Sequence, residues 1–154
     1  MIESIKTLMN DKTADDSLAI ALFSEIMTSD QLIRAQLTKA LPKGMELSHF
    51  SVLNHLAHQG VERSPAQLAR LFSVTKGAMT NTLNRLEMAG YVHIRPDWDD
   101  ARKKKVALSV AGRNARDQAV RAVEPVFDEV IKHMGVDKIK ATLPILRELR
   151  AALS

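Results

Sequence analysis

Apolar residues in the middle of the chain recur at helical spacing, and residues that start or stop helices lie between them. Ser64 can cap a helix, and Pro65 suits its first position, where the missing N–H costs nothing. The apolar stripe that follows is Leu68, Leu71 and Phe72. Thr75 can cap a second helix that ends before Gly90, with the stripe Met79, Leu83 and Leu86. This pattern predicts two short helices joined by a tight turn.

Alternating residues follow the second predicted helix. Residues 91–95 predict a strand, residues 96–101 are rich in turn formers, and residues 102–108 predict a return strand with four consecutive cations. Ser109 can cap a further helix, with Gly112 in its first turn. Together these elements predict a winged helix-turn-helix, whose second helix would enter a DNA major groove and whose wing would reach the phosphate backbone or minor groove.

Helices are also predicted on the N-terminal side of this region. Residues 1–14 are weakly amphipathic and predict a short helical arm, and residues 15–17 offer caps for a separate long helix that reaches about Leu41. Ser48 is predicted to cap the next helix, which Gly60 ends. That helix is expected to pack beneath the helix-turn-helix pair.

The C-terminal third predicts two more helices. Residues 110–134 have helical spacing, and Pro125 predicts a kink within them. Asp137 is predicted to cap the last helix, which Pro144 should bend. Its apolar stripe is nearly continuous: Ile139, Leu143, Leu146, Leu149 and Leu153.

The predicted fold is therefore mainly α: a winged helix-turn-helix with a small β-hairpin wing, plus long N- and C-terminal helices. Residues 45–109 are assigned to the winged helix, and residues 1–44 and 110–154 to a helical dimerisation region. The flanking helices carry more apolar surface than a small winged helix can cover. A two-fold dimer and an intramolecular helical bundle both satisfy this pattern.

Charge and composition narrow the functional classes. Ten Lys or Arg residues face five Asp or Glu between Val61 and Arg113, whereas the rest of the chain has 12 against 13. Basic residues therefore concentrate in the predicted DNA-binding region. The chain has no cysteine, no apolar run long enough to span a membrane and no secretory signal at its start, so we expect a cytoplasmic protein without disulfides.

The outward face of the second predicted helix is polar and contains no acid. Lys76, Thr80 and Asn81 are the candidates for base contacts, because they occupy its N-terminal half. Thr75 is expected to contact a phosphate, and Arg85 the DNA backbone. Two simpler interpretations stay open: a solvated polar helix face, and a Gly77 that is merely tolerated rather than placed for close backbone approach.

The wing sequence resembles a known family. The order Asp100-x-Arg102-x-x-x-Val106-x-Leu108-Ser109-x-x-Gly112-Arg113 is similar to the wing signature of the MarR family of bacterial transcription regulators. Leu86-Glu87-x-x-Gly90-Tyr91-Val92 resembles that family's exit from the recognition helix. Ser109 departs from the pattern, since the family more often has Thr there, but both residues cap helices.

The resemblance implies roles for the wing. In the family, the Asp-x-Arg arrangement turns the arginine toward the minor groove, and Asp100 can hold Arg102 in a charge-assisted pair. A surface ion pair of little energetic weight is the simpler alternative. Strand alternation prevents three consecutive lysines from all facing DNA, so we expect Lys103 and Lys104 to do so.

The resulting hypothesis is a homodimeric, double-stranded DNA-binding repressor that reads a pseudo-palindromic operator. The resemblance also implies a small-molecule effector in the crevice between the dimer helices and the winged helix, although no motif identifies it. The alternative is a winged helix that serves as a protein-interaction or architectural module without small-molecule sensing.

An enzyme would be a third functional class, but the sequence shows no signature of a catalytic, metal or cofactor site. The sequence lacks a Gly-rich phosphate loop and a nucleophile elbow, so we expect a protein that is not an enzyme and needs no cofactor. His55 and His58 have a spacing that can hold a metal, but His49 lies on another face and no acid cluster is near, so ordinary histidines are favoured. Trp98 is expected at the exposed wing tip, with no role assigned.

Overall fold

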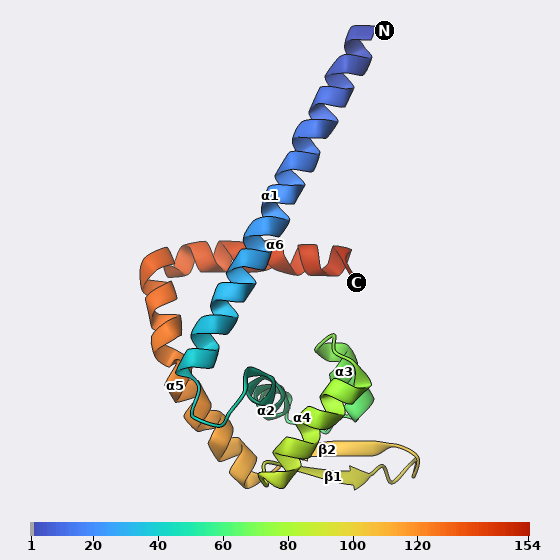
Figure 1. The fold of residues 1–154 in the computed structure, drawn as a ribbon, viewed down its shortest axis with the longest axis vertical. Coiled ribbons are helices and arrows are strands. Elements are labelled where there is room, and N and C mark those ends of the chain that lie inside the picture. The colour runs from blue at the N-terminus through green and yellow to red at the C-terminus, as the bar shows by residue number, and fades with distance from the viewer. Residues whose placement is uncertain (1) are drawn as a thin grey trace. The chain divides into compact units, whose positions relative to one another are not determined.

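The computed structural model describes residues 2–154, with side chains from Lys12 onward. Six helices and one antiparallel hairpin cover these residues (Figure 1). Their order is α1 (Ile2–Ala40), α2 (Leu47–Gln59), α3 (Pro65–Leu71), α4 (Lys76–Met88), β1 (Val92–Pro96), β2 (Lys104–Leu108), α5 (Val110–Met134) and α6 (Val136–Ala152). The predicted mainly α fold with one hairpin is confirmed. The chain divides into one unit that ends at Lys39 and a second from Ala40 to Ser154.

In the first unit, α1 is one continuous helix. It passes through residues 15–17, and the Ser17 hydroxyl donates to the carbonyl oxygen of Thr13 at 2.9 Å. A serine that bonds back to the preceding turn is compatible with a helix interior, so the prediction of a short arm and a separately capped helix is wrong. Met1, part of that predicted arm, lies outside the described residues. Large apolar side chains of α1 are exposed: Leu18, Ile20, Leu22, Phe23, Met27, Leu32 and Ile33.

In the second unit, α2, α3, α4 and the hairpin share one apolar core. The predicted stripe of α4 is buried, because Met79, Leu83 and Leu86 are each at most 3% exposed. They pack with residues from the other elements: Val52, Leu53, Leu56, Leu68, Ala69, Val92 and Val106. Burying one face of α4 in this way leaves its polar face directed to solvent.

The start of α2 differs from the prediction. The helix begins at Leu47, and Ser48 lies inside it instead of capping it. The cap is Glu46, which forms a reciprocal capping box with His49: the backbone N–H of Glu46 donates to His49 Nδ1 at 3.3 Å. This pair satisfies the free N–H groups at the helix start. Gly60 ends α2 in the left-handed conformation with φ of 62°, as predicted.

The hairpin is shorter on its return side than predicted. Val92 pairs with Leu108 and Pro96 with Lys104, so β2 begins at Lys104. Arg102 and Lys103 belong to the turn, and the predicted strand over 102–108 is wrong at its first two positions. The turn extends this far because the N–H of Lys103 donates to the carbonyl oxygen of Asp100 at 2.9 Å. Arg63 adds a bridge to Val106 on the outer edge of β2.

The two C-terminal helices have nearly the predicted bounds. Ser109 caps α5 as predicted, and α5 and α6 continue past Pro125 and Pro144. Asp137 lies in the first turn of α6, whose cap position is Gly135, so the predicted aspartate cap is wrong. No residue of α6 is buried. Among residues 2–154, no helix is both long enough and apolar enough to cross a membrane.

A close backbone contact joins the start of α5 to the end of α4. The Ser109 hydroxyl donates to the Gly90 carbonyl oxygen at 2.6 Å and accepts from the N–H of Gly112 at 2.9 Å. A Cβ atom on Gly112 would lie 1.9 Å from the carbonyl oxygen of Tyr91. A residue without a side chain is therefore required at this junction.

Gly112→Ala tests this requirement. The added methyl group collides with backbone that cannot rotate away, so we expect a loss of about 2–3 kcal/mol in the free energy of unfolding, measured by urea denaturation. Gly77→Ala is the matched control, because nothing lies within 4 Å of a Cβ there. That helical substitution should be neutral or stabilise by up to about 1 kcal/mol. Equal stability of the two variants would contradict the close contact.

Candidate nucleic-acid interface

Helices α3 and α4 are joined by a tight, well-capped turn. The Ser64 hydroxyl accepts from the N–H of Gln67 at 3.1 Å, and Gln67 Oε1 accepts from the N–H of Ser64 at 2.8 Å. At α4, Thr75 Oγ1 accepts from the N–H of Ala78 at 3.1 Å. Ser73 reverses the chain between them with φ of 52°, an uncommon conformation for a residue other than glycine. These contacts fix the N-terminal ends of both helices.

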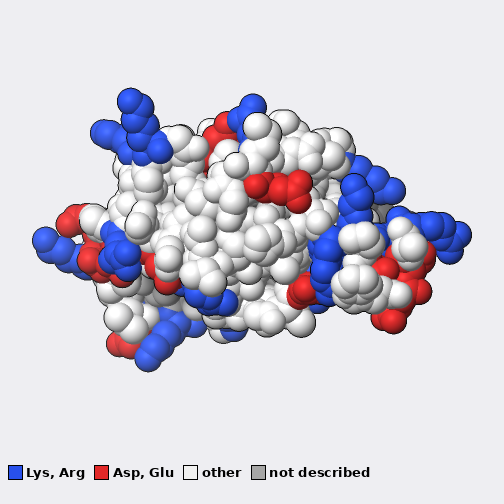
Figure 2. Space-filling view, turned by 90° about the horizontal axis from the view of Figure 1, so that it is seen from below, with Lys and Arg blue, Asp and Glu red and all other residues white. Residues whose placement is uncertain are grey.

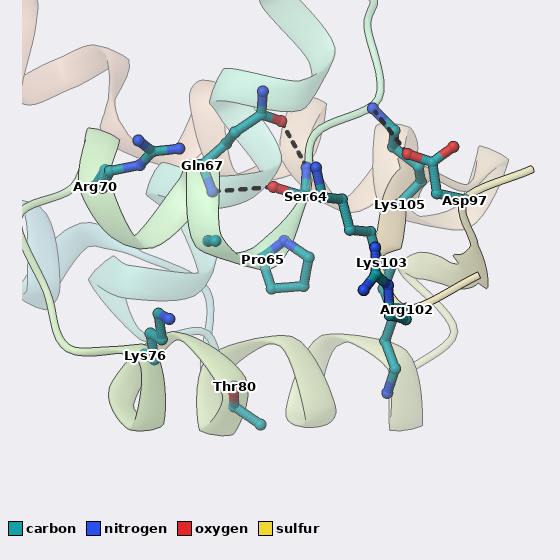
Figure 3. Close-up of a pocket in the computed structure, with 12 residues that line it drawn as sticks. Ser64, Pro65, Gln67, Arg70, Lys76, Thr80, Asp97, Arg102, Lys103 and Lys105 are labelled. Carbon is teal, nitrogen blue, oxygen red and sulfur yellow. Dashed lines mark hydrogen bonds and ion pairs between the residues drawn. The ribbon is translucent and has the colours of Figure 1, made fainter. Parts of the chain in front are cut away.

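A groove of about 460 Å³ lies between these helix starts and the wing. Figure 3 shows α3 residues on one side, Lys76 and Thr80 of α4 on another, and wing residues on a third. Its lining consists of Ser64, Pro65, Ala66, Gln67, Arg70, Lys76, Thr80, Asp97, Arg102, Lys103, Lys104 and Lys105. The two consecutive helices and the wing, which follows later in the chain, therefore meet around one open groove.

The groove is strongly cationic. Six of its lining residues are Lys or Arg, and Asp97 is the one acid among them. Asp97 is itself occupied, because its carboxylate lies 3.9 Å from Lys105 Nζ. In the space-filling view, basic side chains with acidic ones among them lie toward both the left and the right, and the hairpin of Figure 1 lies on the right (Figure 2). Such a surface attracts a polyanion.

Arg102 is held by Asp100 yet remains open to solvent. Its backbone N–H and its Nε both donate to Asp100 Oδ1, at 3.1 and 3.2 Å. The Arg102 side chain is nevertheless 91% exposed. The backbone hydrogen bond, followed by the guanidinium bond, lowers the pKa of Asp100 below its usual value. Asp100 therefore stays ionised and orients a cation that still projects outward.

Five of the predicted contact residues line the groove together: Lys76, Thr80, Arg102, Lys103 and Lys104. The groove is not lined by the other three candidates at the start of α4, which are exposed there: Thr75, Gly77 and Asn81. Asp100 lies in the wing turn, where its carboxylate accepts hydrogen bonds from Arg102. The structure thus brings the recognition helix and wing candidates to one face, while their contacts with DNA remain a prediction.

Arg85 lies apart from the groove. Its NH1 donates to Glu46 Oε1 at 2.7 Å, which joins the last turn of α4 to the start of α2. The predicted phosphate contact of Arg85 stays a prediction, and it would have to compete with this ion pair.

Seven groove residues were not predicted as contact residues, and three of them have long side chains that can donate hydrogen bonds: Gln67, Arg70 and Lys105. Gln67 and Arg70 share the outward face of α3, where polar residues three apart were a usable signal. Strand alternation predicted that Lys105 would not face DNA. Its Nζ does turn to the Asp97 carboxylate, but the residue still lines the groove.

A second pocket, of about 540 Å³, lies between the start of α2, the end of α4 and α5. Its polar lining residues are Lys43, Glu46, His49, Arg85, Tyr91 and Gln118. Burial lowers the pKa of His49; Glu46 opposes this effect and Arg85 adds to it. Because Nδ1 accepts from a backbone N–H, the neutral imidazole carries its proton on Nε2. Among the described residues, buried Nε2 has no hydrogen-bond partner.

Comparison with known proteins finds a matching family model for part of the chain. The model of the MarR family matches residues 43–103, which span α2 to the wing turn. Over this region the chain is similar to the MarR family. This is a family of winged-helix transcription regulators and not an enzyme class.

Individual MarR-family relatives cover nearly the whole chain. A mutant of MarR from E. coli, solved in complex with operator DNA, is 26% identical with a TM-score of 0.75, covering 84% of this chain and 94% of that one. BldR from Sulfolobus solfataricus is 23% identical with a TM-score of 0.77, covering 86% and 94%. The transcriptional activatory protein BadR of Rhodopseudomonas palustris is 24% identical over 94% of this chain and 86% of its own length.

The pKa of Asp100 provides a direct test of the wing geometry. Arg102→Ala removes the guanidinium bond but keeps the backbone N–H, so the pKa of Asp100 should rise part of the way toward its ordinary value. The measurement is an NMR titration of the Asp100 side chain in both proteins. Lys140→Ala, an exposed change on α6, should leave that pKa where it is. An Asp100 pKa insensitive to Arg102→Ala would show that the two side chains do not interact.

Proposed function

We propose that this protein is a sequence-specific, double-stranded DNA-binding transcription regulator that acts as a homodimer in the cytoplasm. The observation that carries the proposal is the cationic groove between the start of α4 and the wing. Operator DNA in the structure of the similar E. coli protein supports the same partner here. A duplex matches such a groove because its phosphates attract the cations while α4 enters the major groove.

Within this proposal, the contact residues have distinct roles. Lys76, Thr80 and Asn81 reach base edges from the first turns of α4, and Gly77 lets the backbone approach closely. Thr75 donates to a phosphate at the helix start. Arg102, oriented by Asp100, enters the minor groove. Lys103 and Lys104 contact phosphates beside it and contribute affinity more than sequence preference.

The dimer follows from apolar surface outside the winged helix. Exposed side chains recur along α1 and on the C-terminal helices, among them Phe127, Val130, Leu143 and Leu146. Such stripes are ordinarily buried against another surface. A two-fold dimer would present two copies of α4 to half-sites about one helical turn apart and so read a pseudo-palindrome.

We propose repression as the mode of action, by occupation of a promoter. The similar BadR protein is named as an activator, so the position of the operator relative to the promoter determines the sign of regulation. A winged helix used only for architectural or protein contacts is the alternative.

The pocket between α2, α4 and α5 is the proposed effector site. It offers the Arg85 guanidinium as a cation and His49, whose Nε2 has no hydrogen-bond partner among the described residues and lies 4.0 Å from Glu46 Oε2. A small molecule with a carbonyl or carboxylate acceptor fits these groups. Because Arg85 belongs to α4, a ligand that draws it from Glu46 would shift the recognition helix.

Salt dependence of binding tests the DNA proposal. Operator affinity, measured by fluorescence anisotropy between about 50 and 200 mM salt, should fall with a log–log slope of about −4 or steeper, since each neutralised phosphate contributes about −0.9. Lys103→Ala should flatten the slope, and Lys140→Ala on α6 should not. A wild-type slope near −1 would contradict duplex binding through this groove.

Two neighbouring acids give a sharper test. Removing a negative charge from the wing should strengthen DNA binding, and Asp99→Ala is expected to do so slightly. Asp100→Ala should instead weaken operator binding by about threefold or more, because Arg102 loses the carboxylate that orients it. Both affinities are measured with the same duplex. A gain in affinity for both variants would show that Asp100 has no orienting role.

Reciprocal binding tests the effector site. A compound that binds this pocket should raise the melting temperature and change the affinity of the protein for operator DNA. Operator DNA should change the affinity of the protein for the compound by the same factor. Gln118→Trp, which crowds the pocket, should abolish this stabilisation and leave operator affinity without the compound unchanged. A compound that acts equally on the Gln118→Trp protein binds elsewhere.

A further inference from the structure

One large apolar side chain at the wing tip has no role in the proposed function so far. Trp98 is 82% exposed, and it lies in the turn that connects β1 to β2. It is the single tryptophan of the chain. An exposed indole of this size is the kind of group that contacts a partner, because it offers a large apolar surface with few rotatable bonds.

One neighbouring side chain, that of Arg95, packs against the indole. The Arg95 guanidinium lies over the ring, with Cζ 5.5 Å from its centre. Arg95 itself is fixed, since it forms an ion pair with Glu62 and its NH1 donates to the carbonyl oxygen of Pro96 at 3.0 Å. A cation held by the Glu62 carboxylate and the Pro96 carbonyl oxygen supports the ring. Its donors are engaged by the protein, so Arg95 is poorly placed to contact DNA itself.

Backbone hydrogen bonds place Trp98 in the same short loop as Arg102. The N–H of Asp97 donates to the carbonyl oxygen of Lys103 at 2.9 Å, which closes the loop around Trp98. Asp97 also accepts from the N–H of Asp99 at 3.0 Å and pairs with Lys105. The ring therefore belongs to a structured turn.

The charges around the ring favour DNA as its partner. Asp97 and Asp100 direct their carboxylates into the loop, where they hold Lys105 and Arg102. Arg102, Lys103 and Lys104 are exposed, and Asp99 is the exposed acid among the loop residues. An apolar ring flanked by outward cations matches the backbone of a duplex, in which apolar sugar faces alternate with phosphates.

We propose that Trp98 is a DNA-contact residue that packs against a backbone deoxyribose at the edge of the minor groove entered by Arg102. The proposal rests on the DNA-binding function stated above. The contact is apolar and adds affinity without neutralising a phosphate. It also restricts how deeply the wing can enter, because the ring rests on the groove wall while Arg102 extends past it.

Fluorescence of the single tryptophan tests the contact directly. The probe is a duplex selected from a random pool by the wild-type protein, with its binding followed separately by anisotropy of a labelled strand. Acrylamide quenching of Trp98 should be strong in the free protein and fall by about half or more at saturating duplex, because sugar and phosphate cover the ring. Unchanged quenching with clear anisotropy binding overturns the contact. Strong protection without DNA, at any protein concentration, also overturns it, because a protein surface would then cover the ring.

Substitution adds an energetic test. Trp98→Ala should weaken binding about fivefold, a modest value for an aromatic contact with nucleic acid, and Trp98→Phe should retain part of it. The salt slope should not change, since no charge is removed. A changed slope would show that the substitution acts through Arg95 and would overturn the packing role. Full affinity in Trp98→Ala would overturn it as well.

Met88→Ala is the matched control. Met88 is 88% exposed at the end of α4 and does not line the groove, so its removal should leave affinity unchanged. Neither substitution should lower the melting temperature, because both side chains are exposed. A wild-type protein that binds no duplex would refute the proposed function itself. Binding by wild type and Trp98→Ala alike would refute only the role of Trp98.

Discussion

The structure of the winged helix depends on the junction between α4 and α5. Gly112 allows the first turn of α5 to approach the carbonyl oxygen of Tyr91, and Ser109 bonds both to Gly90 and to the N–H of Gly112. The end of the recognition helix, the base of the hairpin and the start of a long helix therefore meet at a few backbone groups. Movement of α5 would be transmitted to α4 and the wing through this contact, since no flexible side chain lies between them.

Acidic residues around the interface mostly hold cations and loops in place. Glu62 braces Arg95, Asp97 pairs with Lys105, Asp100 orients Arg102, and Glu46 engages Arg85. Exposed ion pairs of this kind contribute little to stability. Their effect here is positional: Asp100 and Asp97 orient Arg102 and Lys105 at the groove, which would reduce the ordering cost of binding DNA under the proposed function.

Local signals explain what could be predicted from the sequence. Ser64, Thr75 and Ser109 cap their helices as expected, because a hydroxyl that accepts from a nearby N–H is a property of a few consecutive residues. Ser48 and Asp137 offered equally good local signals and were wrong, since Glu46 with His49 and the backbone at Gly135 provide those helix starts instead. The continuous α1 shows the same limit, because a residue that can cap a helix can also lie inside one, as Ser17 does.

Tertiary contacts explain what could not be predicted. Arg85 and Glu46 are 39 residues apart, and nothing near Arg85 in sequence announces that pair. Arg70 and Gln67 join the groove because the core places α3 beside the wing. Trp98 and Arg95 are close in sequence, but Glu62, which fixes the arginine, comes from the segment before α3.

The central claim is that two copies of this winged helix read one duplex. Selection of bound DNA from a random duplex pool, followed by sequencing, tests it most directly. The account predicts a two-fold pseudo-palindrome whose half-sites are about one helical turn, roughly 34 Å, apart. Recovery of a single unpaired half-site, or of no motif despite binding at low salt, would contradict it.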